Sequence, residues 1–305
     1  MDCINLLELF EEDCALRNIT SSKAYRLYSL HLALFLEKRG KDVLNIDRED
    51  LKAYLVYLKK ERNVKFATIE RNFTVLNSFY TFLVEENYTQ NNPIPSFRKR
   101  YLRQYKSDNG SEARQIISIE DASKLVHSIL SSRDRAIAVL LFKTGMRCGE
   151  LRRLDIEDID LDAGTIQLKP TPKRSNRTLF LDSEAISVLR RWLDARKTMN
   201  KTETSALFIG RGSTRLCARQ IKKIIADYAA RIGLHDPESE HLEDRFTPHC
   251  CRHWFTTHLI RSGMSRDFVK ELRGDIRHEA IDIYNHIDKK ELRESYLAHI
   301  PQLGI

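Results

Sequence analysis

The sequence predicts a mainly α-helical chain with a small antiparallel β-sheet, arranged as a helical N-terminal domain and a larger α+β domain. Apolar residues recur about every 3.6 positions along most of the chain, which is the period of an amphipathic helix. The region around residues 156–181 instead alternates apolar and polar residues, as strands do. A length of 305 residues allows two domains. We place these domains at 1–103 and 116–305, with a linker at 104–115.

The N-terminal domain is predicted to be a small helical bundle. Its helices carry apolar stripes at helical spacing and begin at residues that cap helices well. The predicted caps are Thr20 or Ser21 for the second helix, Asp47 for the third and Thr68 for the fourth. Any four-helix module would show this pattern, so the bundle alone indicates no ligand.

A basic and aromatic segment follows the bundle, after Asn91-Asn92-Pro93-Ile94-Pro95 interrupts the helical pattern. The stretch FRKRYLRQYK has no acidic residue and interleaves aromatic side chains with basic ones. The basic residues are Arg98, Lys99, Arg100, Arg103 and Lys106. Such a segment at a domain junction fits a strap across a nucleic-acid backbone. A solvated linker is the alternative.

The second domain begins with a helix capped by Ser118 and continues with a strongly apolar helix from Ala136 to Phe142. A glycine turn after this helix holds Arg147, and Glu150 lies one helical step further on. A charged residue in such a turn is either a solvated cap or a functional group that the fold holds in place. The sequence favours neither interpretation.

Three strands are predicted next, at Ile156 to Leu161, Thr165 to Leu168 and Arg177 to Leu181. They form a short antiparallel sheet, and the polar tip of its last hairpin bears Lys173, Arg174 and Arg177. A lysine at such a tip is usually solvated, but it is also able to swing into a phosphate site.

The stretch RGSTRLCARQIKKIIADYAARIG predicts a helix with a basic face made by Arg215, Arg219 and Lys222 or Lys223. Isoleucines occupy its other faces. A basic face beside an apolar one is a candidate contact with a DNA groove or backbone. A solvated surface helix is the alternative.

The stretch from Thr247 to Asp288 has the residue types for phosphodiester chemistry. His249 and Arg252 lie three apart on a predicted helix that Pro248 begins, so they share a face. A second helix stops at Gly274, and Tyr284 follows on a third short segment. A tyrosine hydroxyl is able to attack a phosphodiester and leave a covalent phosphotyrosine. Arginines stabilise the charge that develops on the phosphoryl oxygens, and the leaving hydroxyl needs a general acid.

Composition sets wider limits on the function. A net charge of +8 and a pI near 9.1 suit a polyanionic partner. Six cysteines without C-x-x-C pairs indicate reduced thiols in a cytosol, so we expect a cytoplasmic protein. The acidic, amphipathic N-terminus is unlike a signal peptide, and no apolar run is long enough for a membrane span.

Four motifs together resemble the tyrosine recombinase family, that is, the phage integrases and Xer-type recombinases. TGMRCGELRRL resembles its first arginine motif, and the hairpin with Lys173 followed by RTLFL resembles its lysine hairpin. TPHCCRHWFTTHLIRSG resembles its His-x-x-Arg motif, and VKELRGDIRHEAIDIYNHID resembles the final motif, in a form similar to that of archaeal members. The motifs occur in the family's order over 116–305. The helical domain is similar to the family's core-binding (SAM-like) domain.

The resemblance implies a role for each matching residue. Arg147 and Arg252 would bind the scissile phosphate, His249 would take part in proton transfer, Lys173 would protonate the leaving 5′ hydroxyl, and Tyr284 would be the nucleophile. Glu150 would orient Arg147. The basic segment and the basic helix face described above give the predicted DNA-binding set, which is Arg98, Lys99, Arg100, Arg103, Arg215, Arg219 and Lys222.

The family's reaction also has implications beyond single residues. It needs no metal and no other cofactor, because the 3′-phosphotyrosyl bond conserves the energy of the phosphodiester. The partner would be double-stranded DNA, on which a synaptic tetramer exchanges strands through a Holliday junction. The use would be chromosome dimer resolution or integration and excision of a mobile element. The apolar tail after Tyr296 would dock on a neighbouring protomer, or else fold back on its own domain.

Two positions depart from the family pattern or leave a choice open. Asp275 stands where the family usually has His, and it would accept a hydrogen bond from His249, an arginine or Tyr284; His278 is a substitute imidazole. Arg174 or Lys169 would replace Lys173 if the hairpin tip is aligned differently.

Alternative interpretations remain for the nucleophile, for a metal site and for the function. Tyr296 is the rival nucleophile, although its charged neighbours predict an exposed helix. His249 and His253 at i, i+4 are a candidate zinc pair that no downstream ligands complete. The alternative functions are a catalytically silent DNA-binding accessory protein of the same fold and a type IB topoisomerase.

Overall fold

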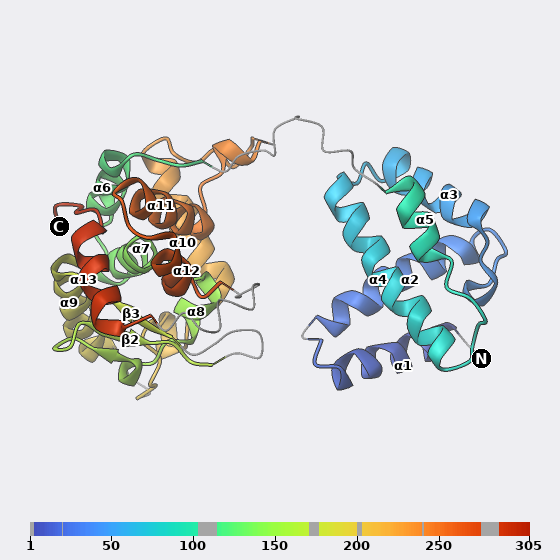
Figure 1. The fold of residues 1–305 in the computed structure, drawn as a ribbon, viewed down its shortest axis with the longest axis horizontal. Helices are drawn as coiled ribbons and strands as arrows, with labels where there is room; N and C mark the ends of the chain where they lie inside the picture. The colour runs from blue at the N-terminus through green and yellow to red at the C-terminus, as the bar shows by residue number, and fades with distance from the viewer. Residues whose placement is uncertain are drawn as a thin grey trace. The chain divides into compact units, whose positions relative to one another are not determined.

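The computed structural model describes most of the chain. It covers residues 3–19, 21–102, 115–170, 177–199, 203–239, 241–275 and 287–305. The chain divides into two compact units, Met1–Asn109 and Gly110–Ile305 (Figure 1). The linker proposed at 104–115 lies almost entirely outside the described residues, so its limits stay a prediction.

The N-terminal unit is a bundle of helices around an aromatic core. Its helices are α1 (Cys3–Leu16), α2 (Ser22–Glu37), α3 (Arg48–Val56), α4 (Phe66–Glu85) and α5 (Ile94–Tyr101), with shorter turns at η1 (Val43–Asn45) and η2 (Tyr57–Glu61). Phe10, Tyr54, Phe73 and Phe79 are fully buried at its centre. Asp47 caps α3 as the sequence predicts, since its carboxylate accepts from the backbone N–H groups of Glu49 and Asp50.

The prediction that the bundle ends before the basic segment is wrong. Residues 94–101 form α5, and Ile94, Phe97 and Leu102 are buried in the core of the same unit. The Phe97 ring stacks on Phe73 with centroids 5.3 Å apart. Arg98, Lys99 and Arg100 therefore lie on a helix that is anchored to the bundle, not on a free strap.

The second unit combines helices with a three-stranded sheet. Its helices are α6 (Ile119–Ser128), α7 (Ser132–Thr144), α8 (Cys148–Arg153), α9 (Ser183–Met199), α10 (Ala218–Arg231), α11 (Pro248–Arg261), α12 (Arg266–Arg273) and α13 (Lys289–His299). Short 3₁₀ turns occur at η3 (Ile156–Asp158), η4 (Arg211–Ser213) and η5 (Leu242–Asp244). Helix α7 lies inside the unit with the other helices around it (Figure 1), and every side chain from Ala136 to Thr144 is buried.

The sheet is smaller than the sequence predicts. Its strands are β1 (Ile159–Asp160), β2 (Thr165–Gln167) and β3 (Thr178–Phe180), in the order β1-β2-β3. All neighbouring pairs are antiparallel, with Ile159 opposite Ile166 and Ile166 opposite Leu179. Residues 156–158, predicted as strand, form the turn η3 instead. The tip of the last hairpin, 171–176, lies outside the described residues.

The C-terminal tail packs on its own unit. Leu303 and Ile300 are buried in the core, and the Glu184 carboxylate accepts from the backbone N–H groups of Leu303, Gly304 and Ile305. Glu184 also accepts from the fully buried Lys143, 2.5 Å away. Figure 1 shows the chain end beside α6, where the Leu303 carbonyl accepts from Ser123.

The exposed placement that the sequence suggests for Tyr296 is wrong. Its side chain is 1% exposed on α13, and its hydroxyl donates to the Lys143 carbonyl at 2.9 Å. Burial raises its pKa well above the usual value. A buried, hydrogen-bonded hydroxyl of this kind is a poor nucleophile.

Two findings on the described residues complete the fold. None of the helices in the described part of the chain is long and apolar enough to cross a membrane. Within the same part, five cysteines are unpaired thiols, namely Cys14, Cys148, Cys217, Cys250 and Cys251.

Candidate active site

Two arginines that are far apart in the sequence, Arg147 and Arg252, are held in place by different local structures. Arg147 is the N-cap residue of α8 and lies two positions after Gly145, whose φ is +58°. A Cβ at Gly145 would lie 2.3 Å from the Phe255 ring, so glycine is required there. Arg252 lies on α11, which begins at Pro248 as the sequence predicts, and its side chain is only 4% exposed.

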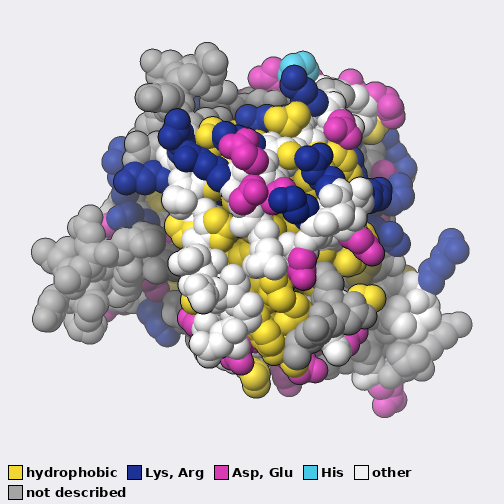
Figure 2. Space-filling view, turned by 90° about the vertical axis from the view of Figure 1, so that its right-hand side faces the viewer, with side chains coloured by type: hydrophobic (Ala, Val, Ile, Leu, Met, Phe, Trp, Pro, Cys, Tyr) yellow, Lys and Arg dark blue, Asp and Glu magenta, His cyan; other side chains and the backbone are white. Residues whose placement is uncertain are grey.

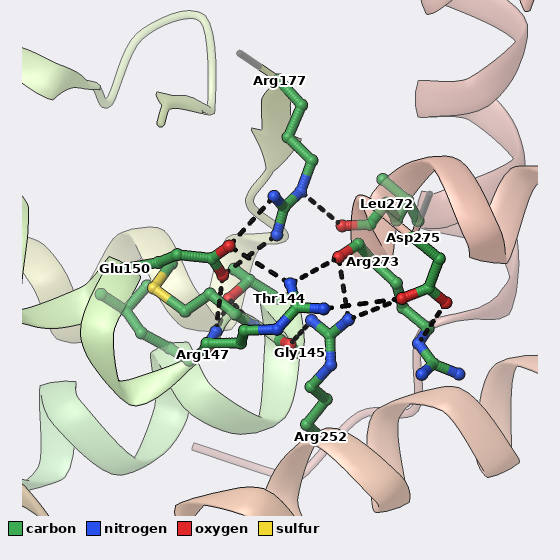
Figure 3. Close-up of polar contacts among 11 residues, drawn as sticks. Thr144, Gly145, Arg147, Glu150, Arg177, Arg252, Leu272, Arg273 and Asp275 are labelled. Carbon is green, nitrogen blue, oxygen red and sulfur yellow. Dashed lines mark hydrogen bonds and ion pairs between the residues drawn. The ribbon is translucent and has the colours of Figure 1, made fainter. Parts of the chain in front are cut away.

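Both guanidinium groups converge on the end of α12 (Figure 3). Arg252 donates from Nη1 to the Gly145 carbonyl at 2.7 Å and from Nη2 to the Arg273 carbonyl at 2.8 Å. Arg147 donates from Nη1 to the same Arg273 carbonyl at 3.2 Å. One backbone oxygen therefore aligns two arginines that are 105 positions apart in the chain (252 − 147).

Asp275 is the acidic member of this cluster. Its Oδ1 accepts from Arg252 Nη2 at 3.2 Å and lies 3.6 Å from Arg147 Nη2, while Oδ2 lies 3.0 Å from Arg273 Nε. The sequence analysis named an arginine as one partner for Asp275, and the structure shows arginines in contact with its carboxylate. Burial, together with the positive charges of Arg147 and Arg273, lowers the pKa of Arg252 to about 10. Arg252 still stays protonated at neutral pH, and a nearby anion stabilises that charge.

The site is closed on one side and open on the other. Arg252 is nearly buried, whereas the side chains of Arg147 and Asp275 are 29% and 31% exposed. An anion from solvent therefore has access to Arg147 and to the carboxylate. Burial lowers the pKa of Arg147 as well.

Glu150 contacts Arg147, and it has a further partner that the sequence analysis missed. Its Oε2 accepts from the Arg147 backbone N–H at 2.7 Å, and its Oε1 accepts from Arg147 Nη1 at 3.3 Å. Arg177 donates to both oxygens at 3.1 Å in a bidentate pair. Burial raises the pKa of Glu150, but the hydrogen bonds and charges of Arg177 and Arg147 outweigh it, and the pKa is lowered.

His249 lies on the exposed side of α11, one turn before His253. The two imidazole rings meet edge to face with centroids 4.7 Å apart. Among the described residues, no group of three His, Cys, Asp or Glu side chains is arranged to hold a metal ion.

Several predicted site residues lie outside the described residues: Lys173, Tyr284 and Arg103, with the substitutes Arg174 and His278. The substitute Lys169 is described, and its ammonium group contacts Asp155, Asp158 at 3.5 Å and Glu157 at 3.9 Å. Hydrogen bonding to Asp155 raises its pKa. A lysine held by three carboxylates is poorly suited to donate a proton to a leaving group.

The predicted basic face on α10 needs a correction. The helix begins at Ala218, so Arg215 precedes it and is not on its face. Arg215 donates to the carbonyls of Arg152 and Leu154 at 3.0 and 2.9 Å and also contacts Asp155. Arg219 and Lys222 do lie on α10 and are exposed.

Basic side chains of the N-terminal unit are mixed with acidic ones on the face that Figure 2 presents. Lys and Arg gather in the upper half of this view, with Asp and Glu among them. On α5, Lys99 and Arg100 are exposed, while Arg98 donates to Thr74 at 3.0 Å. The Arg100 guanidinium lies 5.7 Å from the centre of the Tyr101 ring, within cation–π range.

The chain matches family models in both units. Residues 109–291 match the phage integrase family, and residues 6–90 match the phage integrase N-terminal SAM-like domain. The tyrosine recombinase XerC of Pelotomaculum thermopropionicum is 30% identical over 270 residues, covering 85% of this chain and 82% of the relative. The tyrosine recombinase XerD of Oceanobacillus iheyensis is 28% identical over 264 residues, covering 84% and 83%.

A solved structure shares the fold. The XerH site-specific recombinase bound to palindromic difH substrate, in a post-cleavage complex, superposes with a TM-score of 0.68 at 23% sequence identity. The match covers 95% of this chain and 83% of that one. The mainly helical architecture with a small antiparallel sheet, predicted from the sequence, is thus confirmed.

Proposed function

Since this chain belongs to the phage integrase family and is, like its relatives, a tyrosine site-specific recombinase, we propose that the arginines at the end of α12 bind the phosphate at which it cuts DNA. The enzyme acts on double-stranded DNA, which it cuts and rejoins through a 3′-phosphotyrosyl intermediate and a Holliday junction. Its use in the cell is chromosome dimer resolution or the integration and excision of a mobile element.

The observation that carries this proposal is the shared contact of Arg147 and Arg252 with the Arg273 carbonyl and Asp275. The two guanidinium groups already point at one place, so they bind a phosphate with little reorganisation. Arg252 supplies a fixed charge from the buried side, and the partly exposed Arg147 meets the DNA. Paired N–H donors also match the geometry of phosphoryl oxygens.

We assign the covalent step to Tyr284 and Lys173 on the strength of the resemblance. The Tyr284 oxygen forms a bond to phosphorus, the bond from phosphorus to the 5′ oxygen breaks, and Lys173 gives a proton to that oxygen. The proton of Tyr284 passes to a base at the site, for which His249 is the candidate. In the rejoining step the 5′ hydroxyl of a second strand attacks and releases the tyrosine.

We assign to Asp275 the part of a counter-ion in the DNA-free enzyme. Three arginines within 3.6 Å of one carboxylate would otherwise repel one another. Asp275 keeps them together before DNA arrives. An incoming phosphate then competes with this carboxylate for Arg147 and Arg252, so Asp275 both organises the site and limits its affinity.

DNA contacts outside the site are assigned to α5 and α10. Lys99 and Arg100 on α5, and Arg219 and Lys222 on α10, are exposed basic residues on well-packed helices. Such side chains bind the phosphate backbone with little sequence preference. We leave Arg215 out of this set, because its guanidinium is engaged with Asp155 and two carbonyls.

We further propose a synaptic tetramer on DNA in which the C-terminal tail is exchanged between protomers. In the single chain the tail fills its own unit, where Glu184 holds the N–H groups of residues 303–305. The same receptor is able to accept the tail of a neighbour. Deleting Pro301 to Ile305 should weaken cooperative binding to a two-site duplex while binding to a single site survives. Unchanged cooperativity would remove the tail from the proposal.

The catalytically silent alternative is not favoured, because the chain's relatives are named as recombinases and its arginine cluster is intact. Strand exchange tests the proposed function. A target is first obtained by incubating the protein with a pool of random-sequence duplexes, denaturing, and sequencing DNA that is covalently attached.

A plasmid and a linear duplex that both carry this target are then incubated with the protein. Recombinant products from wild type but not from Tyr284→Phe are expected. Relaxed plasmid without recombinants would indicate a type IB topoisomerase instead. No covalently attached DNA in the capture step, with tight binding to the duplex pool retained, would indicate the silent protein.

A further inference from the structure

Arg177 has a deeply buried side chain although it belongs to a surface hairpin. It directly follows the hairpin tip, and its backbone carbonyl accepts from the Leu168 N–H at 3.0 Å at the hairpin base. Its side chain is only 3% exposed. Arginine is almost never this deeply buried unless its charge and its donors are all matched.

The Arg177 guanidinium reaches two of the elements that build the phosphate site (Figure 3). Nη1 and Nη2 donate to the two oxygens of Glu150 at 3.1 Å each, and Nε donates to the Leu272 carbonyl at 3.0 Å. Glu150 in turn holds Arg147 at its backbone N–H and its guanidinium. Arg177 and Arg147 are therefore linked through a single carboxylate, that of Glu150.

Arg177 also contacts the last turn of α12. Gly274 ends this helix with φ +60°, and a Cβ there would lie 2.4 Å from Arg177 Nη1. The guanidinium thus lies against the bare backbone of Gly274 and is hydrogen-bonded two residues earlier. Between these two contacts lies Arg273, whose carbonyl accepts from both Arg147 and Arg252.

We propose that Arg177 is a positioning residue of the phosphate site, which fixes Glu150 and the end of α12 so that Arg147 and Arg252 stay aligned, without itself touching DNA. The inference rests on the proposed function of this site. Arg177 is suited to this role because its planar guanidinium group donates to both carboxylate oxygens of Glu150 at once, which a lysine ammonium group cannot do.

A comparison of two substrates separates positioning from general stability. One is a suicide duplex with the captured target and a normal scissile phosphate, and the other carries a methylphosphonate at that position. The methylphosphonate removes one negative charge, so its cleavage depends less on well-placed arginines. Single-turnover formation of the covalent adduct is measured for wild type, Arg177→Met and Arg177→Lys.

Arg177→Met is expected to slow cleavage of the normal substrate by about 10²-fold. The loss on the methylphosphonate substrate should be at least several-fold smaller. Arg177→Lys keeps the charge but not the fork, so it should recover only part of the rate and show the same asymmetry. It also serves as the test if Arg177→Met fails to fold.

Arg196 provides a matched control for the loss of a buried arginine. It is 4% exposed in the same unit and donates to the carbonyls of Ala206 and Thr204, away from the phosphate site. Arg196→Met should slow both substrates by the same factor, through stability alone. Equal losses on both substrates for the Arg177 variants would overturn the inference while leaving the proposed function intact. No adduct from wild-type protein would overturn both.

Discussion

Arg252 donates from Nη2 to the carboxylate of Asp275 at 3.2 Å, and the same carboxylate oxygen lies 3.6 Å from Arg147. A fixed negative charge thus sits among the cations that we assign to the scissile phosphate. The two anions compete for the same donors. The carboxylate therefore stabilises the arginine cluster in the absence of DNA, and it weakens the binding of the substrate phosphate.

Asp275→Asn should therefore bind its target duplex more tightly. Removing a partly exposed charge next to two arginines is expected to be worth about 1 kcal/mol, or roughly fivefold in affinity at moderate salt. Fluorescence anisotropy with the captured duplex measures this. Asp267→Asn removes the same charge from the exposed first turn of α12. Equal affinities for these two variants would show that Asp275 does not compete with the phosphate.

Lys173→Met and Lys169→Met should differ in a way that identifies the general acid. Lys173→Met is expected to slow cleavage of a normal phosphodiester by about 10²–10⁴-fold. A bridging 5′-phosphorothiolate should restore its rate, because a thiolate with a pKa of about 8.5 leaves without a proton.

Lys169→Met should stay within a few-fold of wild type on both substrates, since its ammonium group is held by Asp155 and its neighbours. Rescue of Lys169→Met by the sulfur substrate would instead assign the acid to that residue.

Asp155 should give the second unit part of its stability near neutral pH. Burial opposes ionisation, but hydrogen bonds from Lys169, Arg215 and Ser205 lower the pKa of Asp155 from 3.8 to about 2. Because the folded pKa is the lower one, the stabilisation is present above the unfolded value of 3.8 and is lost as pH falls towards 2.

Asp155→Asn is expected to cost about 2 kcal/mol at pH 7, and the two proteins should converge on acidification. Both tryptophans, Trp192 and Trp254, lie in this unit, so urea unfolding followed by tryptophan emission reports on it. Asp194→Asn, in an exposed pair with Lys197, should change little at any pH. A gap between wild type and Asp155→Asn that persists at pH 2 would refute this origin.

The backbone turn before Arg147 gives a fourth test. Gly145→Ala places a Cβ against the Phe255 ring at a φ of +58°, so it should destabilise the unit by about 3 kcal/mol. Gly233→Ala meets no atom within 4 Å at a φ of +77° and should cost only about 1 kcal/mol. Urea midpoints from tryptophan emission compare the two. Similar midpoints would mean that Phe255 moves aside at little cost.

The local pattern of the sequence was sufficient for much of the fold but not for the partners of charged side chains. Capping at Asp47 and the helix start at Pro248 follow from neighbouring residues, and both were predicted correctly. Helix α5 was mistaken for a strap because Pro93, Pro95 and a basic run resemble a linker. A proline is equally compatible with the first turn of a helix, and the burial of Phe97 decided the outcome.

The misjudged site residues share one cause, which is that burial depends on contacts distant in the sequence. The sequence analysis counts Arg177 among the basic residues of the hairpin tip, yet Arg177 alternates with Leu179 and Leu181, which are both buried. That period of two was the available signal. Tyr296 looked exposed among charges, but it lies four residues from Leu292 and Ile300, which are also buried. For Asp275 no local signal names Arg147 and Arg252 as partners, because only the tertiary fold brings them together.

Covalent trapping on the captured target tests the central claim most directly. The protein is incubated with a nicked suicide duplex, denatured, and digested, and the peptide that carries DNA is identified by mass spectrometry. We expect the adduct on Tyr284, its loss in Tyr284→Phe, and its retention in Tyr296→Phe, because Tyr296 is buried and bonded to Lys143. An adduct that survives in Tyr284→Phe, or that maps to another residue, would contradict the account.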